Sequence, residues 1–240
     1  MQEPKVNLLI VGPPRSGTSL IAAMISRHSD AAIIFEPKNM VSDRILSKKI
    51  VGQKLCIPNQ IELRDKNTLK KRILVNRLLN VPVIKIIAIK YKYPLANFSI
   101  EDHLSQGNSK IIGLIRDGND VIGSIMRRGE QTFAEASYRW SRAIEVIHNL
   151  IKDYNDKVLL MSFENIVQNP EKYLKTITEF INVSYEPEML EGYKYTPIYH
   201  DSKGIDKNKA YRSKNEKIDF NLEDKFPKTM RKYRYLKKHC

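Results

Sequence analysis

Two stretches of the chain combine a glycine, hydroxyl groups and an arginine at points where a short apolar run gives way to helical spacing. The first is Gly12-Pro-Pro-Arg-Ser-Gly-Thr-Ser19, which directly follows the apolar run Val6–Val11. A helix N-terminus offers unpaired backbone N–H groups and a partial positive charge, so an anion binds there readily. Gly17 lets the backbone approach such a ligand closely. Hydroxyl donors come from Ser16, Thr18 and Ser19. The stretch is therefore predicted to hold a phosphate.

The second stretch, Ile112–Ser124, repeats the order of strand, turn and helix. Arg116 stands at the predicted strand end, and Ser124 lies on the helix that follows. A phosphate bound there would take a charge-assisted hydrogen bond from the arginine and another from the serine. Arg128, one turn further on, falls on the same helix face. Two alternatives stay open: Arg116 pairs with Asp117 or Asp120 at the helix start, and Ser124 is a small residue packed on the sheet.

The first loop differs from the phosphate loop of nucleotide triphosphatases at one decisive position. Gly12 and Gly17 have the spacing of the pattern G-x-x-x-x-G-K-[ST], but Thr18 stands where those enzymes carry lysine. The cation of the loop is instead Arg15, inside it. This departure argues against an ATPase or a GTPase.

The elements that position these loops alternate along the chain. Strands are predicted over Val6–Val11, Ile33–Phe35, Val83–Ile89, Lys110–Ile115 and Val158–Met161. Helices are predicted over Thr18–His28, Asp117–Arg128, Phe133–Tyr154 and Pro170–Ile181. Such alternation indicates a parallel sheet covered on both faces, in which ligands bind at the carboxyl ends of the strands.

Composition limits the class of protein without selecting one. The 240 residues suffice for one sizeable domain, and a formal charge of +14 favours an anionic partner. Cys56 and Cys240 lack the spacing of a metal site or a disulfide framework. No signal peptide is recognisable at the N-terminus, and no apolar run reaches the ~20 residues that span a bilayer. We expect a cytoplasmic protein with no transmembrane segment.

The two motifs, about 100 residues apart, resemble those of the sulfotransferase family. Pro14-Arg-Ser-Gly-Thr-Ser19 is similar to its 5′-phosphosulfate loop, and the stretch around Arg116 and Ser124 is similar to its 3′-phosphate motif, with Gly118 in place of the usual proline. A third segment, Leu159–Pro170, resembles the family's R-Y-E-D-L-x-x-x-P stretch, with Phe163 where many members have tyrosine.

The resemblance implies a three-layer α/β, P-loop-like fold with about five parallel strands in one domain spanning residues 1–240. A helical acceptor-binding insertion is expected at about 40–82, and a basic segment at about 201–240. The implied donor is 3′-phosphoadenosine 5′-phosphosulfate (PAPS), the implied product is 3′,5′-bisphosphoadenosine, and no metal is required. The implied donor-binding residues are Arg15, Ser16, Gly17, Thr18, Ser19, Arg116, Ser124 and Arg128, with Ser213 from the C-terminal part.

Sulfuryl transfer to a hydroxyl, or as second choice an amine, needs a general base and cations for the developing charge. Glu36, after the second strand, is the predicted base; His28 and His103 are weaker candidates. Arg15 and Lys92 are the predicted catalytic cations, and Lys90 competes with Lys92 because strand alternation puts both on one face.

Two other hypotheses remain, a kinase-like phosphotransferase and a non-catalytic binder of an anionic polymer such as nucleic acid. The C-terminal run of lysines and arginines, interleaved with Tyr233 and Tyr235, fits such a polymer, although no recognised nucleic-acid module accompanies it. The same run also fits a solvated basic helix. The expected acceptor is a small molecule or a glycan, although a hydroxyl group on a lipid or a peptide tyrosine also fits. The sequence gives neither the acceptor's identity nor the oligomeric state.

Overall fold

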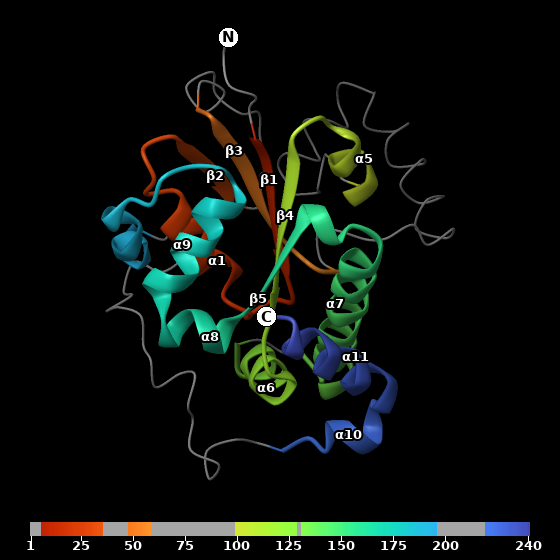
Figure 1. The fold of residues 1–240 in the computed structure, drawn as a ribbon. Coiled ribbons are helices and arrows are strands. Elements are labelled where there is room, and N and C mark those ends of the chain that lie inside the picture. Colours follow the sequence, from red (N-terminus) through yellow and green to blue (C-terminus); the bar gives the residue numbers. More distant parts are fainter. Residues whose placement is uncertain (1–5, 36–47, 59–98, 129–130, 196–218) are drawn as a thin grey trace, which may run out of the picture.

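The computed structural model describes residues 6–35, 48–58, 99–128, 131–195 and 219–240, and within them forms one parallel sheet of five strands in the order β2-β3-β1-β4-β5 (Figure 1). The strands are β1 (Val6–Gly12), β2 (Ala31–Phe35), β3 (Ile50–Cys56), β4 (Ser109–Ile115) and β5 (Val158–Ser162). All four pairings are parallel, so every strand ends at the same edge of the sheet. This arrangement confirms the predicted parallel sheet.

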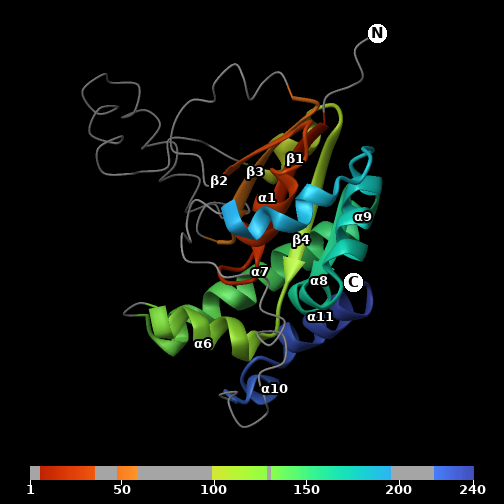
Figure 2. The same cartoon turned by 90° about the vertical axis from the view of Figure 1, so that its left-hand side faces the viewer.

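Helices cover both faces of the sheet, as Figures 1 and 2 show. One layer contains α1 (Thr18–Ile25), α9 (Pro170–Phe180) and the 3-10 helix η2 (Pro187–Tyr195). The other contains α5 (Ile100–Ser105), α6 (Gly118–Arg128), α7 (Phe133–Asp153) and α11 (Pro227–Lys238). The remaining short elements are α8 (Phe163–Gln168), α10 (Leu222–Lys225) and η1 (Asn155–Lys157). The three-layer, P-loop-like fold follows from this arrangement.

Strand alternation divides the core between these two layers. On β1, Leu8 and Ile10 pack in the cluster that contains residues of α1 and α9, whereas Leu9 and Val11 pack in the cluster that contains residues of α7. All four side chains are at most 1% exposed, as expected for the central strand of a sheet that is covered on both sides.

The long helix α7 supports the second layer. Thr132 and Glu135 form a reciprocal capping box that fixes where the helix begins. Its buried stripe includes Trp140, Ile144 and Ile147, at helical spacing. The predicted helix is therefore confirmed to within one residue of its observed end. Among the described helices, none is long and apolar enough to cross a membrane.

The strand next to β1 is the main correction to the predicted elements. A helical insertion is expected at about 40–82, but within it Ile50–Cys56 forms β3, between β1 and β2. Gly52 fits because a Cβ there would lie 2.7 Å from the Leu8 carbonyl oxygen and 2.7 Å from Ile33 Cδ1. The strand predicted over 83–89 lies outside the described residues.

Within the basic C-terminal segment, Pro227–Lys238 forms a helix that is not exposed to solvent on all sides. Within α11, Tyr233 is 4% exposed and Leu236 is fully buried, and both belong to the cluster that contains the buried face of α7. The lysines and arginines therefore occupy the outer side of a helix whose inner side is part of the core.

The 3-10 helix η2 lies directly on the backbone of α1 through Gly192. An added Cβ there would come within 2.3 Å of Met24 Cα and 2.6 Å of the Ala23 carbonyl oxygen. Neither atom is the end of a flexible side chain, so the contact leaves room for glycine alone.

We predict that Gly192→Ala lowers the free energy of unfolding by about 1–3 kcal/mol, because the backbone must shift to admit one methyl group. Gly107→Ala is the matched control, since nothing lies within 4 Å of a Cβ at that position. Urea unfolding of both variants measures the difference. Equal midpoints for the two variants would contradict the packing described.

Candidate active site

The predicted phosphate loop lies at the carboxyl end of β1 and leads directly into α1. Ser16, fully buried, donates its hydroxyl hydrogen to the Pro13 carbonyl oxygen at 2.7 Å, which closes the turn. Gly17 adopts φ +88°, a left-handed conformation that favours glycine, and a Cβ there would also lie 2.5 Å from the Phe163 ring. Within the described residues, no side chain caps the N-terminus of α1 and no acidic residue lies in its first turn. The helix therefore presents backbone N–H groups suited to an anion.

The two predicted phosphate motifs are joined by hydrogen bonds in both directions. The Arg15 Nε donates to Ser124 Oγ at 3.0 Å, and Arg116 Nη1 donates to the Arg15 carbonyl oxygen at 3.0 Å. Arg15 has φ +71°, which is unusual for a residue with a side chain, and this conformation occurs where its carbonyl meets Arg116. Residues more than 100 positions apart thus form one cationic site.

Arg116 stands just beyond the end of β4, with about 9% of its surface exposed. Its guanidinium lies 4.1 Å from the centre of the Phe163 ring, and its Nη2 is 3.5 Å from Asp120 Oδ2. The open alternative of an Arg–Asp pair is therefore realised together with the contact to the phosphate loop. A planar cation stacked on a ring and fixed at one edge keeps a defined orientation.

The start of α6 is held by carboxylates. Asp117 Oδ1 accepts a hydrogen bond from the Asp120 backbone N–H at 3.2 Å, which caps the start of the helix. Glu164 Oε1, on α8, accepts from the Asp117 backbone N–H at 3.0 Å. The family-like segment Leu159–Pro170, which contains Glu164, therefore holds the backbone of the second phosphate motif at the start of α6.

The other predicted site residues differ in their exposure to solvent, and several lie outside the described residues. Thr18 is buried and Ser19 half-buried in the first turn of α1, whereas Arg128 is exposed at the end of α6, one turn beyond Ser124. Glu36, Lys92 and Ser213 lie outside the described residues, as does Lys90.

A buried lysine outside the predicted motifs lies near the carboxyl end of β3, the strand next to β1. Lys54, on β3, is 2% exposed, and its Nζ donates to Cys56 Sγ at 3.2 Å. Cys56 pairs in register with Gly12, the first residue of the loop, so the ammonium group reaches toward the loop edge of the sheet. Lys54 itself pairs with Ile10, which places its side chain on the α1 face.

The local sequence around Lys54 indicates a strand only weakly. The stretch Ile50–Cys56 includes Gly52 and Gln53 as well as the lysine, so apolar periodicity does not predict a buried strand end there.

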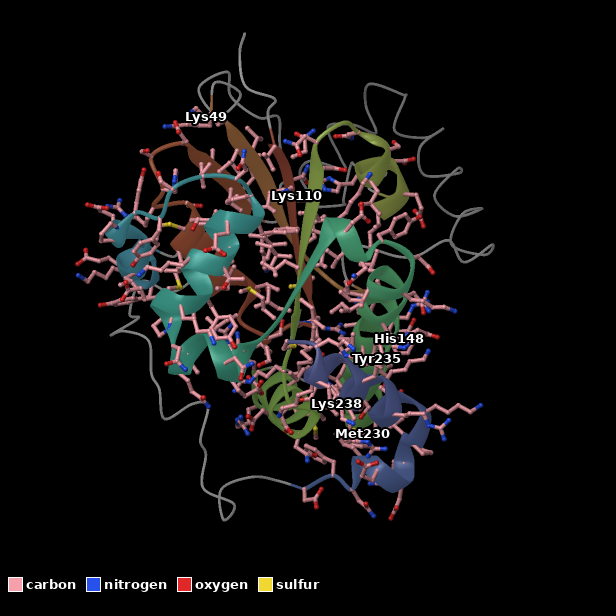
Figure 3. All side chains as sticks on the ribbon, viewed as in Figure 1. Lys49, Lys110, His148, Met230, Tyr235 and Lys238 are labelled. Carbon is pink, nitrogen blue, oxygen red and sulfur yellow. The ribbon has the colours of Figure 1, made fainter. Side chains whose placement is uncertain are left out.

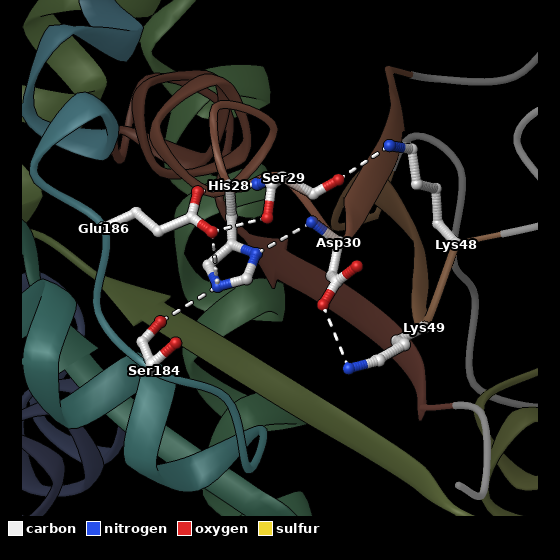
Figure 4. A network of polar contacts seen from close by, with 7 residues as sticks. All are labelled: His28, Ser29, Asp30, Lys48, Lys49, Ser184 and Glu186. Carbon is white, nitrogen blue, oxygen red and sulfur yellow. Dashed lines mark hydrogen bonds and ion pairs between the residues drawn. The ribbon is translucent and has the colours of Figure 1, made fainter. Parts of the chain in front are cut away.

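The two histidines proposed as weaker bases lie at the opposite edge of the sheet. His28 follows the C-terminus of α1, which has eight residues and is therefore about 12 Å long. Its Nδ1 accepts from the Asp30 backbone N–H at 3.0 Å and its Nε2 donates to the Ser184 carbonyl oxygen at 2.9 Å (Figure 4). His103 lies near the start of β4, and burial lowers its pKa, opposed by a hydrogen bond with the Lys110 carbonyl. Neither imidazole reaches the phosphate loop.

The network around His28 has a structural role instead. Glu186 accepts hydrogen bonds from the backbone N–H and the hydroxyl group of Ser29, at 2.7 and 2.5 Å (Figure 4). These contacts attach the segment before η2 to the turn between α1 and β2.

The site fits an anionic ligand with two phosphate positions. The glycine with positive φ and the uncapped helix make a cradle at one position, and Arg116 and Ser124 supply a buried cation and a hydroxyl at the other. Arg15, which touches Ser124, lies between the two.

Comparison with known proteins identifies the family. A family model described as the sulfotransferase domain matches residues 5–235, so the chain belongs to the sulfotransferase family. It is 27% identical over 235 residues to the protein-tyrosine sulfotransferase of Drosophila melanogaster, covering 90% of this chain and 45% of that protein. It is 26% identical over 231 residues to protein-tyrosine sulfotransferase 1 of Danio rerio, covering 88% and 62%. The chain thus spans about half the length of these curated relatives.

A solved structure shows the same fold. The sulfotransferase domain from the Synechococcus PCC 7002 olefin synthase superposes with a TM-score of 0.62 at 19% sequence identity, covering 98% of this chain and 96% of that one. The fold class inferred from the two motifs is therefore confirmed.

We predict that Arg116→Ala weakens binding of 3′,5′-bisphosphoadenosine by about 1.5–3 kcal/mol, the usual cost of losing a hydrogen bond to a charged group. Arg127→Ala, which removes the same charge from an exposed position of α6, is the matched control and should change the affinity little. Titration calorimetry measures both. Equal losses in the two variants would mean that only the overall charge matters.

Proposed function

We propose that this protein transfers a sulfuryl group from PAPS to a hydroxyl group of an acceptor. The observation that carries the proposal is the direct contact between the two phosphate motifs, through Arg15, Ser124 and Arg116. PAPS carries phosphate on both the 5′ and the 3′ side of its ribose, so a donor of this kind requires two anion positions in one site. A triphosphate has its phosphates in a single row and gives no reason for a second position.

The geometry of the described residues supports a donor-binding role for the two motifs, and the family resemblance adds Ser213, which lies outside the described residues. The N-terminus of α1, with Ser16, Gly17, Thr18 and Ser19, binds the 5′-phosphosulfate, and Arg116 and Ser124 bind the 3′-phosphate. Arg128 assists at the 3′ side from the next turn of α6, and Ser213 is a further donor contact. Bound PAPS supplies the sulfuryl group, and the protein supplies orientation and positive charge.

The proposed base and second cation belong to neighbouring strand ends. Glu36 directly follows Phe35, the last residue of β2, and Phe35 pairs in register with Lys54. A carboxylate ordinarily ionised at neutral pH can take the acceptor proton without a large change in pKa. Lys54 is buried near the carboxyl end of β3, the strand next to β1, so we propose it in place of Lys92 as the cation that joins Arg15 in stabilising charge on the leaving oxygen.

We further propose that the acceptor is a tyrosine hydroxyl in an acidic polypeptide, which replaces the expected small molecule or glycan. Both relatives described above are named protein-tyrosine sulfotransferases. The formal charge of +14 independently favours an acceptor rich in carboxylates, which the field of the protein would attract.

The donor is tested first by thermal shift and calorimetry. Micromolar 3′,5′-bisphosphoadenosine should raise the unfolding temperature, because a ligand that binds the folded state alone stabilises it. ATP with Mg²⁺ at the same concentration should have little effect. The reverse result would favour the kinase-like alternative. Equal stabilisation by both nucleotides and by heparin, abolished by salt, would favour a non-catalytic binder of anionic polymers.

The catalytic roles are tested with single substitutions. We predict that Glu36→Gln and Lys54→Met keep the affinity for 3′,5′-bisphosphoadenosine within about threefold but lower the transfer rate by roughly 10²–10³, the range typical for losing a positioned base or a charge-stabilising group. The measurement is transfer of radiolabelled sulfate from PAPS to acidic tyrosine peptides. The same peptides with phenylalanine in place of tyrosine, and a panel of sugars, serve as acceptor controls.

Lys92→Met decides between the two lysines. If Lys54→Met retains full transfer and Lys92→Met loses it, Lys54 is a structural lysine and the role belongs to Lys92. Sulfate incorporated into sugars and not into tyrosine peptides would disprove the proposed acceptor while leaving the donor assignment intact.

A further inference from the structure

Trp140 connects the middle of α7 to the second phosphate motif. Its side chain is fully buried, and its indole Nε1 donates a hydrogen bond to the Arg116 carbonyl oxygen at 3.2 Å. Arg116 is the first residue after β4, so this bond holds the backbone at the point where the chain leaves the sheet and turns into α6. The structure places it in the core, directly behind the arginine.

The C-terminal segment 219–240 closes over the same point. A Cβ at Gly118 would lie 2.6 Å from Leu222 Cδ1 and 2.7 Å from Trp140 Cζ2, so α10 and α7 both contact the start of α6 there. The Phe220 backbone N–H donates to Asn119 Oδ1 at 3.1 Å, which adds a polar link between the two segments.

Tyr233 extends this contact from α11. Its ring centre is 5.7 Å from that of Trp140, with the ring planes inclined at 59°. Burial raises the pKa of its phenol well above the ordinary value, and the carboxylates of Glu164, Asp117 and Asp120 add to that effect. These are the acids that hold the start of α6 and the edge of the Arg116 guanidinium. The buried side of α11 therefore lies in the same cluster as the supports of the arginine.

Besides the Arg15 carbonyl, three described neighbours hold parts of Arg116. Phe163 lies against the face of its guanidinium, Asp120 pairs with one edge, and Trp140 fixes its backbone. The first two contacts come from elements next to the motif. The third depends on α7, and Trp140 is itself packed against a helix more than 100 residues further along the chain than Arg116.

We propose that Trp140 and Tyr233 are positioning residues for the donor's 3′-phosphate, and that the C-terminal segment 219–240 acts through them to set the position of Arg116. The inference rests on the proposed function, because it assigns Arg116 to the 3′-phosphate. An arginine displaced by a fraction of an ångström loses the aligned hydrogen bonds that distinguish a bound phosphate from water. The basic C-terminal helix thereby contributes to donor recognition through its buried side.

The test compares two nucleotides that differ only at the 3′ position. We measure by calorimetry the affinities for 3′,5′-bisphosphoadenosine and for adenosine 5′-monophosphate, which lacks the 3′-phosphate. Their ratio reports recognition of that phosphate, whereas a general loss of folded structure weakens both ligands alike. In Trp140→Phe, which keeps an aromatic ring and removes the indole N–H, we expect the ratio to fall by about five- to tenfold, as for the loss of one well-aligned hydrogen bond.

A second variant and a control accompany this substitution. Tyr233→Leu keeps an apolar side chain but removes the ring against Trp140, and should lower the same ratio. Tyr235→Ala removes a tyrosine from the opposite side of α11, where it is 45% exposed and lies against His148 (Figure 3), and should leave the ratio unchanged.

The outcomes distinguish a failure of the proposed function from a failure of the positioning role. If the unsubstituted protein binds both nucleotides equally, the proposed function itself is wrong. If it prefers the bisphosphate and both Trp140→Phe and Tyr233→Leu preserve the full preference, the positioning role is overturned. A parallel loss of affinity for both nucleotides in these variants would also overturn it, because that result indicates a structural role alone.

Discussion

The hydrogen bond from Arg116 to the carbonyl of Arg15 is the constraint on which the site depends. It requires Arg15 to hold its carbonyl toward β4, and this residue adopts a left-handed backbone conformation. Beyond it the chain reaches Gly17, also left-handed, and then the first turn of α1. Because β1 and β4 are adjacent parallel strands, their carboxyl ends lie side by side, and a contact between residues about 100 positions apart needs no special arrangement of the chain.

Phe163 packs between the two phosphate motifs. Its ring meets the guanidinium of Arg116 on one side, and it leaves no room for a side chain at position 17 on the other. By the resemblance described above, many family members have tyrosine at this position. In this chain the position has a clear packing role that an aromatic ring without a hydroxyl fulfils. The first turn of α8 then brings Glu164 to the backbone of Asp117, so one short segment serves both motifs.

The layers behind the site explain why a basic C-terminal segment can contain buried residues. The helix α11 presents most of its lysines and arginines outward, while Tyr233 and Leu236 enter the core beside α7. A helix of this composition looks solvated when only its charge is considered. Its apolar residues fall three positions apart, on one side, and that spacing is sufficient for docking on a helix with a complementary buried stripe. The charge and the packing are therefore properties of opposite sides of one helix.

Much of the fold was determined by local sequence. The strands β1, β4 and β5 and the helices α1, α6, α7 and α9 lie where apolar periodicity predicts them, because each is continuous and bounded by turn or capping residues. The two phosphate motifs were equally visible, since glycine, hydroxyl and arginine at a strand-to-helix junction constrain their own geometry. The sequence indicated that the two motifs lie at the same edge of the sheet. It did not predict the hydrogen bonds between them.

Local sequence did not determine which segment forms β3, the strand between β1 and β2. The stretch Ile50–Cys56 contains a glycine and two polar residues, a weak strand signal, and it becomes a strand because β1 and β2 supply hydrogen bonds on both sides. That placement determined which lysine is buried beside the loop. Sequence alone thus indicated two anion-binding stretches, through residue types at local junctions. Only the tertiary structure placed Lys54, Phe163 and Trp140 relative to these stretches, because their contacts depend on how distant segments of the chain pack together.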